Sequence, residues 1–111
     1  MSGNDIERVG VVGCGLMGSG IAEVFARAGL DVKVSEANGE ALEIGRTRLT
    51  GSLDTAVRRG KLSAEDRDAA LERISFTTDL ADFADRDLVI EAVAEREDIK
   101  TAIFPHGREV L

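Results

Sequence analysis

This sequence of 111 residues contains one cysteine, one proline and one histidine, and it has no tryptophan or tyrosine. The single cysteine, Cys14, cannot form an internal disulfide, and such sparse cysteine is typical of proteins that fold in a reducing compartment. No apolar run approaches the ~18 residues that a membrane-spanning helix requires. The first residues also lack the basic-then-apolar order of a signal peptide. These absences predict a cytoplasmic protein.

Positive charge is also scarce. Fourteen Lys and Arg residues stand against 21 Asp and Glu residues, which gives a formal net charge of −7. An acidic chain is poorly suited to a nucleic-acid backbone or an anionic membrane, so we expect neither as a partner. We also assign no residue to a metal site. The length suits one domain, and we assign residues 1–111 to it.

Short apolar stretches rich in β-branched residues predict four strands. Helical stretches separate them, which implies parallel pairing with right-handed crossovers. The expected fold is therefore α/β: a three-layer, Rossmann-type parallel sheet with strand order 3-2-1-4. We expect this sheet to be truncated after its fourth strand. The predicted strands are 6–12, 30–35, 74–78 and 87–93.

The helices are predicted from apolar residues spaced three and four apart, and from glycines and capping residues at their ends. Two of them follow one another between the second and third strands, so a long helical arm is expected there. The last helix is expected to run until Pro105. The predicted helices are 18–28, about 40–59, a short one opening at Ser63, and 95–104.

A glycine-rich turn follows the first predicted strand, in the stretch VVGCGLMGSGIA. Its first glycine gives the backbone freedom that a tight turn from strand to helix needs. The second has no β-carbon to block a pyrophosphate, and the third lets the helix lie close to the strand. The start of the helix then offers unpaired N–H groups to the phosphates. The predicted cofactor-binding loop consists of Gly13, Cys14, Gly15, Leu16, Met17 and Gly18.

A lone acid, Glu36, stands at the end of the second predicted strand. A carboxylate at that place accepts hydrogen bonds from the ribose hydroxyls of adenosine, and it repels the 2′-phosphate of NADP. A glycine motif alone is common, but this one follows a strand, opens a helix and precedes such an acid. The sequence therefore predicts NAD as the cofactor.

Three further stretches carry a more specific similarity: GSLDTAVRRGKL, TTDLADFADRDLVIEAVAE and EREDIKTAIF. Together with the glycine loop and Glu36, they make the chain resemble the N-terminal, NAD-binding part of the 3-hydroxyacyl-CoA dehydrogenases, in the 3-hydroxybutyryl-CoA branch. The likeness runs from Ile6 to Phe104. It implies hydride transfer between the 3-hydroxyl carbon of an acyl-CoA and NAD, in fatty-acid metabolism.

The resemblance implies roles for residues outside the loop. Glu95 and Lys100 match positions at the family's NAD site, and Ser52 and Arg59 match positions that touch coenzyme A. Arg59 stands where lysine is expected, and these two cations differ in geometry. The run RRGK at 58–61 concentrates three cations on an acidic chain, which suits a phosphorylated ligand.

The family's catalytic histidine and its glutamate partner have no counterpart in this sequence. His106 lies in a tail that no longer resembles the family, so we assign no catalytic residue. We expect the domain to be incomplete at its C-terminus, without the helical domain that forms the family's homodimer. The isolated chain is then expected to bind NAD weakly without turnover. Its fourth strand would also have an open edge through which it could self-associate.

Two other interpretations stay open at this point. The stretch GLMGSGIA also resembles the 3-hydroxyisobutyrate and 6-phosphogluconate dehydrogenase group, although the arm and Glu36 favour the first family. A noncatalytic nucleotide-binding module is the third possibility, because the catalytic histidine is missing.

Overall fold

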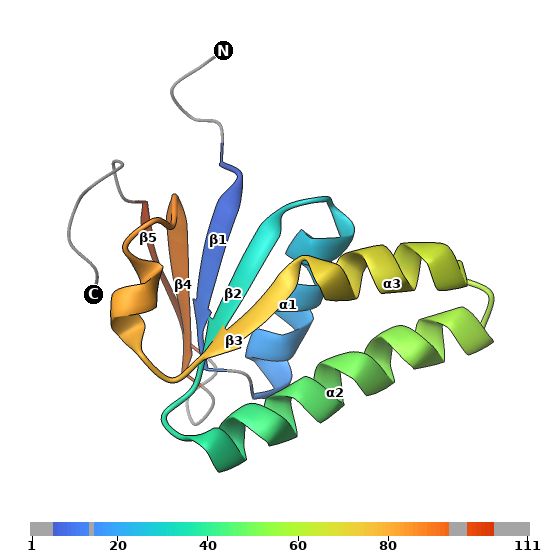
Figure 1. The fold of residues 1–111 in the computed structure, drawn as a ribbon, viewed down its shortest axis with the longest axis horizontal. Coiled ribbons are helices and arrows are strands. Elements are labelled where there is room, and N and C mark those ends of the chain that lie inside the picture. The colour runs from blue at the N-terminus through green and yellow to red at the C-terminus, as the bar shows by residue number, and fades with distance from the viewer. Residues whose placement is uncertain (1–5, 14, 94–97, 104–111) are drawn as a thin grey trace.

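The protein is a mixed α/β sheet with helices packed on it. The computed structural model describes residues 6–13, 15–93 and 98–103. Within them the sheet has five strands in the order β3-β2-β1-β4-β5 (Figure 1). The elements in chain order are β1 (Arg8–Val12), α1 (Leu16–Arg27), β2 (Asp31–Ser35), α2 (Gly39–Arg58), α3 (Ala64–Glu72), β3 (Ile74–Thr77), the 3-10 helix η1 (Leu80–Phe83), β4 (Leu88–Val93) and β5 (Asp98–Ile103).

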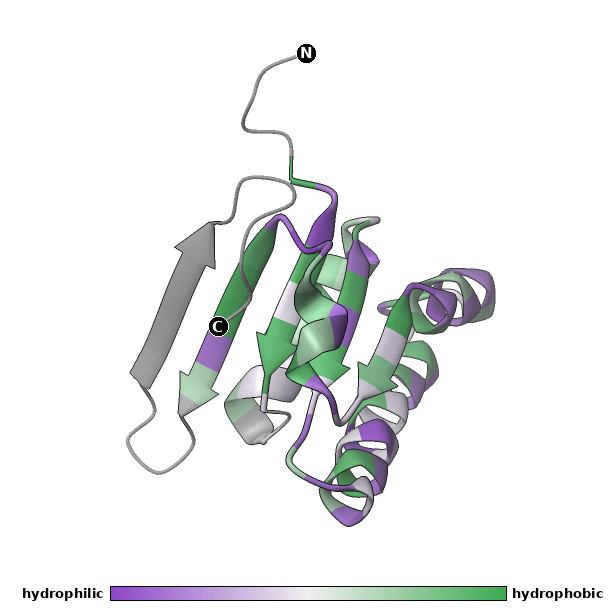
Figure 2. Cartoon of the chain, turned by 60° about the vertical axis from the view of Figure 1, so that its left-hand side comes forward, coloured by the Kyte–Doolittle hydropathy of each residue, from purple (hydrophilic) through white to green (hydrophobic). Residues whose placement is uncertain are grey.

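The first four strands are parallel and confirm the predicted order 3-2-1-4. β1 pairs with β2 on one side and with β4 on the other, and β2 pairs with β3. The register sets Val9 opposite Val32 and Val11 opposite Val34, and all four side chains are fully buried. Figure 2 shows β1 and β4 as mostly hydrophobic along their length, whereas apolar and polar residues alternate along β2, whose sequence is DVKVS. The continuous apolarity of β1 and β4 is expected where a parallel strand is covered on both faces.

One face of this sheet is covered by the three α-helices. Because side chains alternate along a strand, Val9 and Val11 point to the same face of β1. Each helix adds small or branched apolar residues to the core on that face, so the helices lie close to the strands. Those core residues are Ala22 and Ala26 of α1, Leu49 and Leu53 of α2, and Ala70 of α3.

The predicted arm between the second and third strands is confirmed. α2 and α3 form an antiparallel helical pair that extends past the β3 edge of the sheet (Figure 1). Asn38 caps α2, because its side chain accepts a hydrogen bond of 2.8 Å from the Ala41 amide. Ser63 caps α3 in the same way, accepting from the Asp66 amide at 3.0 Å. Within the described ranges, no helix combines the length and apolarity that crossing a membrane would take.

The segment after β4 corrects two sequence-based expectations. We expected a helix over 95–104, but Asp98–Ile103 forms β5, which pairs antiparallel with β4. The apolar spacing of this segment fits a helix, yet a strand here supplies main-chain partners to the edge of β4. The helix prediction is therefore wrong for 98–103, and so is the expectation that β4 presents an open edge for self-association.

The opposite face of the sheet is covered by η1 and the turn that follows it. Gly10 of β1 faces this side, and a β-carbon built on Gly10 would lie 2.7 Å from the Phe83 ring. The ring of Phe83 is fully buried. A glycine in the middle of β1 therefore lets η1 pack directly onto the strand.

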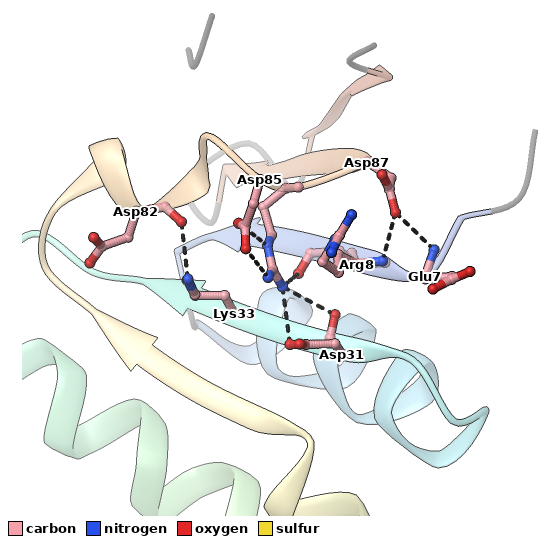
Figure 3. Close-up of polar contacts among 9 residues, drawn as sticks. Glu7, Arg8, Asp31, Lys33, Asp82, Asp85 and Asp87 are labelled. Atoms are coloured by element: carbon pink, nitrogen blue, oxygen red, sulfur yellow. Dashed lines mark hydrogen bonds and ion pairs between the residues drawn. The ribbon is translucent and has the colours of Figure 1, made fainter. Parts of the chain in front are cut away.

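A buried arginine, Arg86, ties this turn to the start of the sheet through Asp85 and Asp31, both labelled in Figure 3. Its guanidinium donates two hydrogen bonds of 2.9 Å to the Asp85 carboxylate and one of 3.1 Å to Asp31 of β2. Nearby, the Asp87 carboxylate accepts 3.0 Å hydrogen bonds from the amides of Glu7 and Arg8, where β1 begins. Polar side chains thus join β1, β2 and β4 at their amino ends.

The Asp85–Arg86 pair predicts an acid-sensitive contribution to stability. The hydrogen bonds from Arg86 lower the pKa of the Asp85 carboxyl from its ordinary value of 3.8 to about 2. A carboxyl whose pKa falls on folding stabilises the fold above about pH 4 and loses that contribution as the pH falls toward 2. We expect Asp85→Asn to lower the thermal unfolding midpoint at pH 7. The midpoints of this variant and of the wild type should become equal near pH 2. Glu43→Gln, on an exposed face of α2, is the control. A difference in unfolding midpoint between the wild type and Asp85→Asn that stays constant with pH would contradict the prediction.

Candidate functional site

The carboxyl ends of β1 and β2 meet at the edge of the sheet where the glycine loop begins. Gly13 directly follows β1 and has a φ of 90°, a left-handed conformation that favours glycine. Its amide donates a 2.8 Å hydrogen bond to the carbonyl of Ser35 at the end of β2. The turn is therefore held against the neighbouring strand, as a tight connection from strand to helix requires.

The N-terminus of α1 presents an uncompensated positive end at this edge. Gly15 is the N-cap, and the first hydrogen bond of the helix runs from the Ser19 amide to the Gly15 carbonyl at 2.8 Å. Amides before Ser19 are left without helical partners, which is the arrangement that binds anions. Among the helices in the described part of the chain, α1 alone has no acid in its first turn. No side chain of that turn therefore neutralises the dipole.

Gly18 brings the helix against the turn. A β-carbon on Gly18 would lie 2.0 Å from the carbonyl oxygen of Gly13, which is far inside any contact distance. Because this neighbour is main chain, it cannot move aside as a flexible side chain would. The predicted role of Gly18 in close packing of helix and strand agrees with this geometry.

Glu36 shares one surface cavity with the glycine turn. The cavity measures about 360 Å³. The Glu36 side chain is half-buried there, and its amide donates a 3.0 Å hydrogen bond to the carbonyl of Thr77 at the end of β3. The lining residues are Val12, Gly13, Ser35, Glu36, Ala37, Thr78 and Leu80.

Several residues of this cavity were not assigned to the site from sequence. Thr78 comes from the connection between β3 and η1, Leu80 is the first residue of η1, and Ser35 comes from the end of β2. The signal for them was indirect: strand order 3-2-1 sets the carboxyl end of β3 beside that of β2. Only with that order known does the TTDL stretch, residues 77–80, become a wall of the cavity.

The remaining residues predicted to bind the cofactor lie in different places. Leu16 is the first residue of α1, whereas Met17 lines a separate apolar patch on the outer side of α1 with Ile21 and Val24. Cys14 and Glu95 lie outside the described residues. The structure thus brings Gly13, Gly15, Gly18 and Glu36 together at one edge, and it does not bring Met17 to the cavity.

Lys100 lies in β5, where the register sets it opposite Glu91 of β4. Glu91 is in turn opposite Val12 of β1, and Val12 is opposite Ser35 of β2. Lys100 therefore stands in the row of the sheet that leads to the cavity, although the segment is a strand rather than the expected helix.

On the arm, Ser52 is engaged by α1. Its hydroxyl donates a 2.5 Å hydrogen bond to the Glu23 carboxylate, and the same carboxylate pairs with Arg27 at 3.3 Å. Arg59 forms the C-terminal cap of α2 and is exposed. The two residues thus lie on the same helix, with Ser52 at the contact with α1 and Arg59 at the far end.

A parallel α/β sheet with a glycine turn, an acid-free helix start and a carboxylate at the next strand defines a dinucleotide-binding domain of the Rossmann type. Residues 8–111 match the family model of the 3-hydroxyacyl-CoA dehydrogenase NAD-binding domain. The chain belongs to this family, and its cofactor is NAD. The match favours this family over the 3-hydroxyisobutyrate and 6-phosphogluconate dehydrogenase group.

Named relatives agree with the family match. A 3-hydroxybutyryl-CoA dehydrogenase of Mycobacterium tuberculosis is 56% identical over 99 residues, covering 89% of this chain and 35% of the relative. A probable 3-hydroxybutyryl-CoA dehydrogenase of Deinococcus radiodurans is 45% identical over 104 residues, covering 94% of this chain and 37% of the relative. This chain therefore spans about a third of the length of these relatives.

Solved structures show the same fold. The crystal structure of FadB2 from Mycobacterium tuberculosis superposes with a TM-score of 0.80 at 56% identity, covering 81% of this chain and 32% of that one. The (S)-3-hydroxybutyryl-CoA dehydrogenase PaaH1 of Ralstonia eutropha gives a TM-score of 0.77 at 38% identity, covering 80% and 31%.

The contact at Gly18 predicts a sharp intolerance of a single methyl group. We expect Gly18→Ala to lower the free energy of unfolding by about 3 kcal/mol, the upper end of what overpacking usually costs. Gly20→Ala is the matched control, because a β-carbon there meets no atom within 4 Å. It lies in the same helix, so it should be neutral or stabilise by up to ~1 kcal/mol. Urea denaturation measures both, and equal midpoints for the two variants would refute the role of Gly18.

Proposed function

We propose that this chain is the NAD-binding part of an enzyme that transfers hydride between the 3-hydroxyl carbon of an acyl-CoA and NAD. The observation that carries the proposal is the cavity shared by Gly13 and Glu36 beside the start of α1. The relatives named as 3-hydroxybutyryl-CoA dehydrogenases support an acyl-CoA substrate with a short chain. The proposal includes a cytoplasmic, homodimeric whole enzyme, as the sequence resemblance implies.

The main chain around the loop fits a pyrophosphate. The amides at the start of α1 have no helical partner, and the absence of an acid in that turn leaves the dipole free to attract phosphate oxygens. The left-handed turn at Gly13 and the close approach of Gly18 bring those amides to the edge of the sheet. Bound NAD supplies the redox chemistry, and the loop's task is to bind and orient it.

Glu36 is the proposed ribose-binding residue. It follows β2 directly, and its amide is held by the carbonyl of Thr77, so the start of its side chain is fixed at the cavity wall. A half-buried carboxylate at this place can accept hydrogen bonds from ribose hydroxyls and repels a 2′-phosphate. This is the physical basis for NAD rather than NADP.

Other residues complete the proposal. The register position of Lys100, in line with Ser35 at the cavity, supports a place for it near the cofactor. Glu95 keeps its proposed role at the cofactor from the family resemblance alone. Ser52 and Arg59 are proposed to contact coenzyme A along the arm. The hydrogen bond from Ser52 to Glu23 fixes the Ser52 hydroxyl at the contact between α2 and α1.

Glu36 allows a direct test by isothermal titration with NAD and NADP. We expect Glu36→Gln to weaken NAD binding by about tenfold, the scale of one charge-assisted hydrogen bond. The same variant should narrow the difference between NAD and NADP, because the charge that repels the 2′-phosphate is gone. Both effects should appear as changes in the dissociation constant without loss of the folded state.

Glu40→Gln is the matched control for this titration. Glu40 is an exposed acid in the first turn of α2, close to Glu36 in sequence but outside the cavity lining. It should leave both affinities within about twofold, since one exposed charge contributes little. The proposed site would be wrong if the two variants bound NAD equally well, or if the wild type preferred NADP.

A further inference from the structure

A second pocket lies at the opposite end of α1 from the glycine turn. It is formed by the last turn of α1, the turn that joins α2 to α3, and one face of α3. The cavity measures about 380 Å³. Three cations and one acid line it, which makes it locally basic on an acidic chain. The lining residues are Arg27, Lys61, Leu62, Asp66, Ala69 and Arg73.

The fold holds the Arg73 guanidinium and the main chain at Lys61 in place. Arg73 donates a 2.9 Å hydrogen bond to the carbonyl of Ala26, near the end of α1, and its remaining N–H groups stay available. Lys61 follows Gly60, whose φ of 72° ends the arm helix, and its amide donates to the Ala56 carbonyl at 2.9 Å. These main-chain and side-chain contacts preorganise the pocket on rigid elements rather than on a long loop.

The charges of the pocket do not cancel one another. Arg27 pairs with Glu23 at 3.3 Å. Across the described ranges, no ion pair joins Lys61 or Arg73 to a carboxylate, and none joins Asp66 to a cation. The pocket therefore keeps an excess of positive charge and of N–H donors.

We propose that this pocket binds a phosphate group. Two guanidinium groups and one ammonium group around a cavity of this size match a doubly charged phosphate with its ester chain, because charge-assisted N–H donors are the usual partners of phosphate oxygens. The RRGK run at 58–61 contributes Lys61, so the cationic run noted in the sequence supplies one wall.

Two sources could supply the phosphate. One is the phosphorylated adenosine end of coenzyme A. The Glu23 carboxylate bonds both Ser52 and Arg27, so the pocket begins one helical turn of α1 from the proposed coenzyme A contact. That source rests on the proposed function. The other is a free phosphate or nucleotide, which requires nothing from the nicotinamide site.

The test is a titration of the whole chain with adenosine 3′,5′-bisphosphate at low ionic strength, in which NMR chemical shifts report binding. We expect Lys61→Gln to weaken binding by about tenfold, the scale of one charge-assisted hydrogen bond. Because Lys61 is exposed and caps the arm through its amide, this variant keeps the fold. Asp66→Asn should tighten binding severalfold, since it removes the acid that opposes the phosphate.

Arg58→Gln is the matched control. It removes the same charge from the same run, but Arg58 bonds Thr55 on α2 and does not line the pocket. It should change the affinity by less than about twofold. Equal weakening by Lys61→Gln and Arg58→Gln would overturn the proposal, as would unchanged affinity in Asp66→Asn or no binding at all.

Two comparison ligands identify the source. Adenosine 3′,5′-bisphosphate binding at least tenfold tighter than adenosine 5′-monophosphate would assign the site to coenzyme A, whereas inorganic pyrophosphate binding equally well would assign it to free phosphate. NAD affinity should be unchanged in all three variants. A failure of the phosphate pocket is thereby separated from a failure of the NAD site.

Discussion

The close contact between α1 and the turn that follows β1 is the constraint on which the edge of the sheet with Gly13 and Glu36 depends. A helix can present its first amides to a ligand beside a strand only if its backbone lies against the turn, and here Gly18 meets the carbonyl of Gly13 with no room for a β-carbon. The hydrogen bond from Gly13 to Ser35 then joins the same turn to β2, which carries Glu36 at its end. One contact thus sets the position of both the first amides of α1 and the Glu36 carboxylate.

Much of this arrangement could be predicted from sequence, because each feature has a local signature. Continuous β-branched runs marked the four parallel strands, and the apolar period marked the helices. Gly60 and Ser63 marked the turn and the cap inside the arm. The glycine spacing and the position of Glu36 predicted that the glycine turn and this acid meet at one edge, since in parallel sheets the carboxyl ends of neighbouring strands meet.

The failures have a common physical cause: they depend on which segments meet in space. Ile99, Ala102 and Ile103 satisfy a helical period, but the same residues form β5 because β4 offers an edge of unpaired main-chain groups. Thr78 and Leu80 belong to the TTDL stretch, which carried a family resemblance but no residue type that points to a ligand. They reach the cavity because β3 lies next to β2, as the predicted strand order implies, and because Leu80 begins η1 at the cavity wall. The local sequence pattern sets which secondary structure a segment prefers, but pairing with a neighbouring strand can override that preference.

The charge distribution along α1 follows from the acidity of the whole chain. A net charge of −7 repels anions at long range. Any phosphate site must therefore be locally positive within the Debye length, which is about 10 Å at 0.1 M ionic strength. At its N-terminus α1 is locally positive without cations, because its first turn contains no acid and its first amides have no helical partner. At its C-terminus the dipole has the opposite sign, which Arg27 complements from the last turn and Arg73 complements by donating to the Ala26 carbonyl. Both arginines line the basic pocket, and each has more N–H donors than its ion pair or hydrogen bond uses.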